Sequence, residues 1–203
     1  MQDLRDETVR VGEIELSLLR PASPEALLDE EAFENDEFLP YWAELWPAAS
    51  ALAAGLPADL RGLRVVELGC GLGVPALVAA RRGADVVATD WAAAAIELLR
   101  TNAKRNGIAL HAKLWDWREP WAERFDLALA ADVLYERRNV EPVVEALRRL
   151  APEALVGLAG RPYEQQFLRE VESWTEVAPR VVRVQLRDGV GSDPVSETSP
   201  RGI

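Results

Sequence analysis

The chain has 203 residues, of which 49% are hydrophobic and 28% are charged, and its formal net charge is −11. This length favours one α/β domain with a substantial core, and the apolar content excludes an intrinsically disordered chain. The acidic balance argues against a general nucleic-acid binder, which needs a basic face, and fits a partner that is small or itself basic.

The counts of cysteine and histidine exclude two further structural features. A single cysteine, Cys70, excludes an intramolecular disulfide, and a single histidine, His111, leaves no metal-ligand cluster, so we expect no metal. Residues 1–20 contain no apolar signal core, and no apolar run approaches the roughly 20 residues of a membrane span. We therefore expect a cytoplasmic protein without a membrane anchor.

The N-terminal segment, residues 1–39, is predicted to decorate the core of a single domain that spans residues 1–203. Residues 9–19 alternate between apolar and polar side chains, which is typical of a β-ribbon or an edge strand, and Pro21 ends the pattern. Residues 29–37 are strongly acidic. They form either a solvated loop or short helix, or a lip that attracts a basic substrate.

An aromatic segment over residues 38–47 leads into the core. It contains Tyr41, Trp42 and Trp46 beside prolines. Aromatic side chains at this spacing often pack in a core, but these are also bulky enough to form the roof of a pocket. Residues 48–56 then predict a helix of small residues that packs closely on a sheet.

The central motif is Glu-x-Gly-x-Gly-x-Gly over residues 67–73, after a predicted buried strand at 63–67. A backbone that turns this tightly from a strand into a helix needs residues without Cβ, and their absence lets a ligand touch the main chain. A dinucleotide-binding fingerprint would require Gly or Ala where Val74 stands. Glu67 would repel a pyrophosphate but attract an ammonium group such as that of S-adenosylmethionine.

Acidic residues also follow the next two predicted strands. The strand at 84–90 ends with Asp90, which is placed to accept hydrogen bonds from both ribose hydroxyls or, alternatively, to cap a helix at 92–106. A third strand at 108–114 is followed by Asp116, which can accept a hydrogen bond from an adenine amino group. A neighbouring indole can pack on the adenine ring, although a purely structural role for the tryptophans here is the alternative.

The second half of the chain continues the β-α alternation. A fourth strand is predicted at 125–132 and ends on Asp132, a helix face follows at 140–150, and a fifth strand lies at 154–159. After a Gly-Arg-Pro turn, the chain is predicted to form a helix with Phe167, Val171 and Trp174 facing inward, and then an antiparallel pair of residues 181–186 with 195–203. This order predicts a doubly wound seven-strand sheet that is mostly parallel and ends in an antiparallel hairpin.

These motifs together resemble a known family. The glycine motif resembles motif I of class I S-adenosylmethionine-dependent methyltransferases. With Pro40 to Pro47, Asp90, Trp117 and the Asp-Val-Leu-Tyr motif at 132–135, the chain is similar to the seven-strand lysine methyltransferase-like family. The aromatic-proline segment and the Gly-Arg-Pro turn at 160–162 are most similar to the electron-transfer-flavoprotein β-subunit lysine methyltransferase branch and its bacterial relatives.

The resemblance covers roughly residues 38–175 and implies a Rossmann-like fold with S-adenosylmethionine as the cofactor. Asp132 and Tyr135, at the lip of the fourth strand, are expected to hold the methyl acceptor and are the candidate catalytic residues. Alternatively, Asp132 only caps the next helix and Tyr135 only packs. The expected cofactor-binding residues are Trp46, Glu67, Gly69, Cys70, Gly71, Asp90, Trp91, Asp116, Trp117 and Ala131.

The expected reaction is methyl transfer to an amine nitrogen such as that of a protein lysine, because an amine donates hydrogen bonds to carboxylate and phenol oxygens. A small amine or a heteroaromatic nitrogen is an alternative acceptor. Two other classes are a dinucleotide-dependent oxidoreductase and a methyltransferase-like protein that only binds a partner. The glycine register argues against the first class, and the presence of Asp90, Asp132 and Tyr135 argues against the second.

Overall fold

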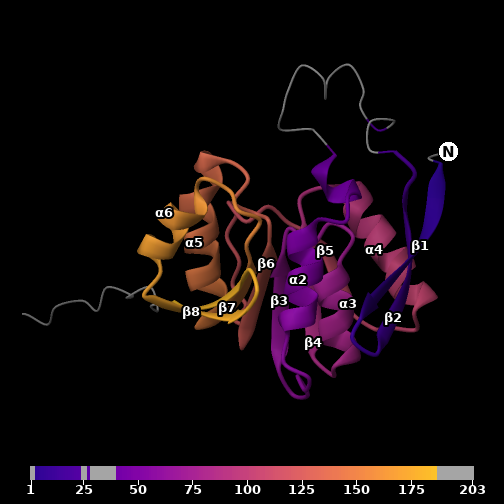
Figure 1. The fold of residues 1–203 in the computed structure, drawn as a ribbon, viewed down its shortest axis with the longest axis horizontal. Coiled ribbons are helices and arrows are strands. Elements are labelled where there is room, and N and C mark those ends of the chain that lie inside the picture. The colour runs from indigo at the N-terminus through magenta and orange to yellow at the C-terminus, as the bar shows by residue number, and fades with distance from the viewer. Residues whose placement is uncertain (1–2, 24–26, 28–39, 187–203) are drawn as a thin grey trace, which may run out of the picture.

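A twisted sheet of seven strands forms the centre of the computed structural model, which describes residues 3–23, 27 and 40–186 (Figure 1). The first five strands pair in parallel, and the last two pair antiparallel, which confirms the predicted fold class. In spatial order, the strands are β5 (His111–Leu114), β4 (Asp85–Asp90), β3 (Arg64–Leu68), β6 (Leu127–Ala131), β7 (Glu153–Gly157), β9 (Val181–Gln185) and β8 (Ser173–Ala178).

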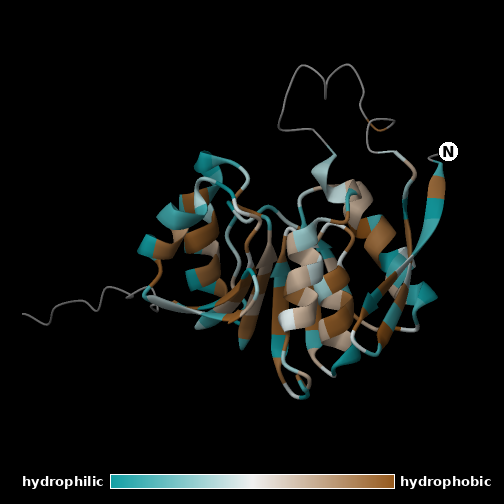
Figure 2. Cartoon of the chain, in the orientation of Figure 1, coloured by the Kyte–Doolittle hydropathy of each residue, from teal (hydrophilic) through white to brown (hydrophobic). Residues whose placement is uncertain are grey.

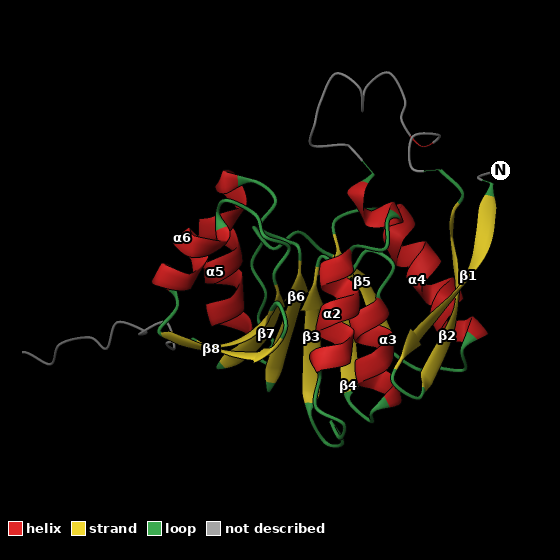
Figure 3. Ribbon diagram, in the orientation of Figure 1, coloured by secondary structure: helices red, strands yellow, loops and turns green. Residues whose placement is uncertain are grey.

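Helices cover both faces of this sheet because successive strand side chains point to opposite faces. In β3, Val65 belongs to the apolar cluster under one set of helices, and Val66 and Leu68 belong to the cluster under the other. Figure 3 shows this layering, and Figure 2 shows hydrophobic residues concentrated along the central strands. The first set is α2 (Pro47–Gly55), α3 (Val74–Arg81) and α4 (Ala93–Arg105), and the second is α5 (Val140–Leu150) and α6 (Glu164–Glu170).

The predicted N-terminal ribbon is confirmed as an antiparallel hairpin that packs on α4 (Figure 1). The side chain of Asn102, which is fully buried, accepts a hydrogen bond from the backbone N–H of Leu19 at 2.7 Å and donates to its carbonyl at 3.0 Å. Asn106 makes the same pair of bonds to Ser17, each at 2.8 Å. Two amides on one helix face therefore anchor the hairpin, whose strands are β1 (Leu4–Val11) and β2 (Ile14–Pro21).

The predicted pairing of the C-terminal hairpin was wrong. The strand at 181–186 was expected to pair with residues 195–203, which lie outside the described residues, but β9 pairs with β8. Trp174 was expected on the inner face of a helix, yet it lies on β8 and is 48% exposed. The helix ends earlier, at Glu170, and the chain reverses through Arg180, which has a positive φ of 63°.

Smaller differences concern the ends of elements and one segment. The third strand is shorter than expected, since β5 begins only at His111, whose side chain is exposed. The acidic segment at 29–37 lies outside the described residues. The N-terminal ribbon begins at Leu4, five residues before its predicted start. The other predicted strands and helices agree with the observed ones to within two residues at each end, a usual uncertainty for such ends.

We predict that Asn102→Ala lowers the free energy of unfolding by about 1–3 kcal/mol, because it leaves the partly buried N–H and carbonyl of Leu19 without their side-chain partner. Urea denaturation followed by circular dichroism measures the change. Thr101→Ala, at an exposed position of the same helix, is the control and should cost less than about 0.5 kcal/mol. Equal losses in the two variants would show that the hairpin does not depend on this amide.

Candidate active site

The loop between β3 and α3 is built on three glycines with left-handed backbone conformations. Gly69, Gly71 and Gly73 have φ values of 60°, 50° and 74°, which side-chain-bearing residues rarely adopt. A Cβ on Gly73 would lie 2.4 Å from a methyl carbon of Leu99, and a Cβ on Gly71 would lie 3.1 Å from the backbone oxygen of Trp42. The loop therefore follows a path open only to glycine, with its main chain close to neighbouring segments.

Asp90 ties this loop to the end of the neighbouring strand β4. One carboxylate oxygen accepts a hydrogen bond from the backbone N–H of Gly71 at 2.8 Å, and the other accepts from the N–H of Ala92 at 2.9 Å. The residue is 4% exposed, and burial raises the pKa of its carboxyl group. Asp90 thus braces both the loop and the start of α4, whereas its contact with a ribose stays a prediction.

Glu67, the last-but-one residue of β3, is a buried acid at the same place. Its carboxylate accepts a hydrogen bond from the backbone N–H of Ala76 at 2.8 Å, and the residue is 1% exposed. Burial raises the pKa of this carboxyl well above its ordinary value, and the nearby charge of Asp90 acts in the same direction. An ionised Glu67 is therefore costly unless a positive group approaches it.

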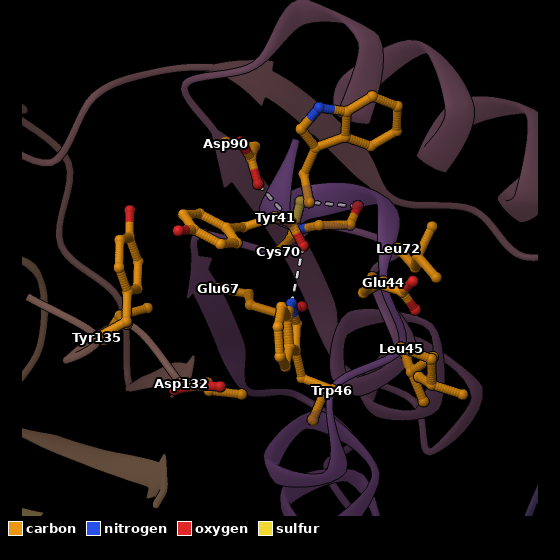
Figure 4. Close-up of a pocket in the computed structure, with 18 of the residues that line it drawn as sticks. Tyr41, Glu44, Leu45, Trp46, Glu67, Cys70, Leu72, Asp90, Asp132 and Tyr135 are labelled. Atoms are coloured by element: carbon orange, nitrogen blue, oxygen red, sulfur yellow. Dashed lines mark hydrogen bonds between the residues drawn. The ribbon is translucent and has the colours of Figure 1, made fainter. Parts of the chain in front are cut away.

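These acids line a cavity at the carboxyl ends of the parallel strands, beside the point where β3 lies between β4 and β6 (Figure 4). Ligands of open α/β sheets bind at such a switch point. Eleven of the twelve predicted site residues line this cavity: Trp46, Glu67, Gly69, Cys70, Gly71, Asp90, Trp91, Trp117, Ala131, Asp132 and Tyr135.

Asp116 is the predicted site residue that the cavity lining does not include. Its carboxylate is engaged by the guanidinium of Arg118 at 2.6 Å and by the Arg118 backbone N–H at 2.9 Å. The neighbouring Trp117 does line the cavity. A Cβ on Gly69 would lie 3.1 Å from a ring carbon of Trp117, so the absence of a side chain at 69 allows the indole to approach the loop.

Aromatic side chains form one wall of the cavity (Figure 4). The rings of Tyr41 and Tyr135 have centroids 5.4 Å apart, and those of Tyr41 and Trp46 are 6.2 Å apart. The indole N–H of Trp46 donates to the backbone oxygen of Tyr41 at 2.8 Å. Trp42 also lines the cavity, so the aromatic segment lies beside the site as the roof interpretation requires.

Asp132 and Tyr135 lie across the cavity from the glycine loop. The carboxylate of Asp132 pairs with Arg161 through two bonds of 2.8 Å, and its backbone has a positive φ of 53°. Burial raises the pKa of Tyr135, although a hydrogen bond with Asn139 opposes the shift. The phenol therefore keeps its proton at neutral pH and can donate a hydrogen bond.

Sequence reasoning missed several lining residues, of which Glu44, Glu136 and Arg161 are charged. The signal for Arg161 was its position just after the fifth predicted strand, because the carboxyl ends of parallel strands share one edge of the sheet. Among the residues that the structure describes, no group of three or more His, Cys, Asp or Glu side chains is arranged to hold a metal. Within the same residues, every helix is too short or too polar to cross a membrane.

Comparison with known proteins places this geometry among methyltransferases. Residues 35–174 match the lysine methyltransferase family. An electron transfer flavoprotein beta subunit lysine methyltransferase of Xenopus laevis is 34% identical over 138 residues, which are 63% of this chain and 54% of that protein. The protein of the same name from Danio rerio is 31% identical over 176 residues, covering 82% of this chain and 67% of that protein. The chain thus spans about half to two thirds of the length of these relatives.

A solved structure shows the same fold. The T. thermophilus 16S rRNA N2 G1207 methyltransferase, in complex with AdoMet and guanosine, matches with a TM-score of 0.65 and 19% identity, covering 91% of this chain and 51% of that chain. The family match and this fold confirm the resemblance inferred from the sequence.

The burial of Glu67 generates a prediction on pH and stability. Because its folded-state pKa is raised, its contribution to stability is complete below the unfolded-state pKa and is lost as pH rises through the folded-state pKa. Glu67→Gln keeps an oxygen for the Ala76 N–H but cannot ionise. The free energy of unfolding of the variant should exceed that of the wild type by a margin that grows as the pH is raised from about 5, just above the ordinary glutamate pKa, through neutrality.

Urea denaturation of the ligand-free protein at several pH values measures this margin. Glu97→Gln, at an exposed position of α4, is the matched control and should show no margin that grows with pH. A difference between Glu67→Gln and the wild type that stays constant over the range would contradict the argument.

Proposed function

The chain belongs to the lysine methyltransferase family, and we propose that it transfers a methyl group from S-adenosylmethionine to the amine nitrogen of a protein lysine. When bound, S-adenosylmethionine supplies an electrophilic methyl group on a sulfonium. The observation that carries the proposal is one cavity with two chemically different ends. Buried acids beside bare glycine main chain form one end, and a carboxylate and a phenol beside aromatic rings form the other.

The residues at the first end fit the cofactor. Glu67 is a buried carboxylate whose charge an approaching ammonium group would stabilise. The Asp90 carboxylate accepts hydrogen bonds from the backbone N–H groups of Gly71, Ala92 and Trp91. A carboxylate has about four acceptor positions, so one position remains for a ribose hydroxyl. The positive φ of Gly69 and Gly71 leaves main chain without Cβ beside this space.

The residues at the second end suit an amine on an aliphatic chain. The rings of Tyr41, Trp46 and Tyr135 provide apolar contact for methylene groups and exclude water. The Tyr135 oxygen and the Asp132 carboxylate can accept hydrogen bonds from a nitrogen and so orient its lone pair. In this proposal the protein positions the acceptor, and no strong base is required.

A protein acceptor is supported by charge and by the relatives. The net charge of −11, with Glu44 and Glu136 on the cavity lining, favours a basic partner over nucleic acid. The relatives from Xenopus laevis and Danio rerio are named for a lysine of the electron transfer flavoprotein beta subunit. We propose a basic protein surface that presents a lysine, in the cytoplasm, as the acceptor.

The test is incubation of the purified protein with methyl-labelled S-adenosylmethionine and a host extract. The proposal predicts label in the protein fraction, recovered as methyllysine by mass spectrometry after hydrolysis. Label found only in small molecules or in nucleic acid would contradict a protein lysine acceptor. Absence of any transfer, with S-adenosylmethionine binding intact, would contradict catalysis.

Tyr135→Phe should lower the turnover number on the acceptor found in this way by about 10²-fold, because it removes the oxygen that orients the amine. Its affinity for S-adenosylmethionine, measured by calorimetry, should stay within about threefold of the wild type. Tyr163→Phe is the matched control, since Tyr163 packs against the apolar core and is not on the cavity lining. Parallel losses of turnover and cofactor affinity in Tyr135→Phe would place the phenol in the cofactor pocket instead.

A further inference from the structure

Arg161 holds the acid at the acceptor end of the cavity. Its guanidinium meets the Asp132 carboxylate with two bonds of 2.8 Å, and the Asp132 side chain is only 4% exposed. This fork geometry is the strong form of an ion pair, because both oxygens are engaged at once. The hydrogen bond to Asp132 also raises the pKa of Arg161, so the guanidinium stays charged.

The surrounding structure fixes this pair in place. Glu164, which is buried, accepts hydrogen bonds from the backbone N–H groups of Ala159 and Gly160 at 2.7 and 2.9 Å, and so braces the turn that carries Arg161. The guanidinium carbon lies 5.7 Å from the centre of the Trp46 ring. The positive φ of Asp132 is a costly conformation for a residue other than glycine, and such strain concentrates at functional sites.

An unpaired Asp132 would work against methyl transfer to an amine. An alkylamine such as the lysine side chain is almost fully protonated at neutral pH, and the nitrogen accepts a methyl group only through a free lone pair. A buried carboxylate beside the nitrogen would stabilise the ammonium form, which has no lone pair. A guanidinium beside that carboxylate offsets its charge and repels the ammonium form.

We propose that Arg161 is the positioning residue that fixes Asp132 and offsets its charge, so that the cavity accepts the acceptor amine in its unprotonated form. The proton of the incoming ammonium group is left in the solvent. Because the inference rests on the proposed amine acceptor, it deepens that function rather than replacing it.

Other charged and titratable groups face the same space from every neighbouring element. Glu67 and Asp90 lie near the carboxyl ends of β3 and β4, and the charge of Asp90 acts on Tyr135. The charge of Glu164 on α6 acts on Arg161. The lining also includes Tyr41, Glu44, Tyr135 and Glu136, of which Glu44 pairs with Arg20 and Glu136 pairs with Arg138. In the part of the chain that the structure describes, Arg161 is the one basic side chain on the cavity lining.

The test is the binding of n-butylamine, which mimics the end of a lysine side chain, to the protein saturated with S-adenosylhomocysteine. Ligand-observed NMR titrations at pH 7 compare the wild type with Arg161→Gln, which loses the charge, and Arg161→Lys, which keeps it. We expect Arg161→Gln to bind n-butylammonium about tenfold more tightly than the wild type, and Arg161→Lys to stay within about threefold of it. The gain should shrink as the pH approaches the pKa of the amine.

Two controls separate the effect of the Arg161 charge from the effect of a larger cavity and from the effect of losing an arginine elsewhere. n-Butanol has a similar size but no charge, so its affinity should be the same in the wild type and in Arg161→Gln. Arg183→Gln removes an arginine of similar exposure from a pair with Glu153 at the other end of β7, and should not change the affinity for n-butylammonium.

Equal affinities of the wild type and Arg161→Gln for n-butylammonium, including no binding by either, would overturn the inference. An equal gain for n-butanol would also overturn it, because the effect would then come from the enlarged cavity. The titration involves no methyl transfer. Failure of the proposed function would instead appear as the absence of methyllysine in the extract experiment, so the two failures are distinguishable.

Discussion

The hydrogen bond from the Gly71 N–H to the Asp90 carboxylate is the contact on which the site depends. It joins the glycine loop after β3 to the end of β4, and two further hydrogen bonds connect β3 and its loop to β4. The Cys70 N–H donates to the Thr89 carbonyl at 2.9 Å, and the Thr89 hydroxyl donates to the Glu67 carbonyl at 2.7 Å. These contacts hold the loop open as a concave surface of main chain, against which the aromatic segment then packs.

The same arrangement places two buried acids beside each other at a cost to stability. Burial raises the pKa of both Glu67 and Asp90, which means that each carboxylate is less well solvated than it would be in the unfolded chain. Both acids hold backbone N–H groups of the loop or of the helices beside it. In the proposed function they also face a ligand with an ammonium group and hydroxyls. At the acceptor end of the cavity, Asp132 has a positive φ, and its ion pair with Arg161 holds it in place.

Much of the fold followed from local patterns in the sequence. The glycine register, the acids at strand ends and the helix periodicity placed β3 to β7 and their helices, because buried parallel strands and amphipathic helices have strong periodic signals. The Trp174 segment was misread because its apolar residues fit a helix and a strand equally well over so short a length. Which strand pairs with β9 is decided by tertiary contacts, and no local pattern encodes them.

The residues that line the site were predictable from the sequence to about the same extent as the fold. Four of the predicted residues lie at or just after the carboxyl ends of strands, so topology brings them to one edge of the sheet, and they do line one cavity: Glu67, Asp90, Asp132 and Tyr135. Side-chain partners were not predictable, because they depend on rotamers and on residues distant in sequence. Arg161 is 29 positions from the Asp132 that it binds. Asp116 pairs with Arg118 in its own loop and does not line the cavity.

The most direct test of the account is a calorimetric titration of S-adenosylmethionine into the wild type and Asp90→Ala, with circular dichroism to establish that the variant is folded. Asp90 is proposed both to brace the loop and to contact the ribose, and losing hydrogen bonds to a charged acceptor costs on the order of 1.5–3 kcal/mol. The account therefore predicts that affinity weakens by tens of fold or more. A folded variant whose affinity changes by less than about threefold would contradict it, and Asp90 would then serve only to start α4.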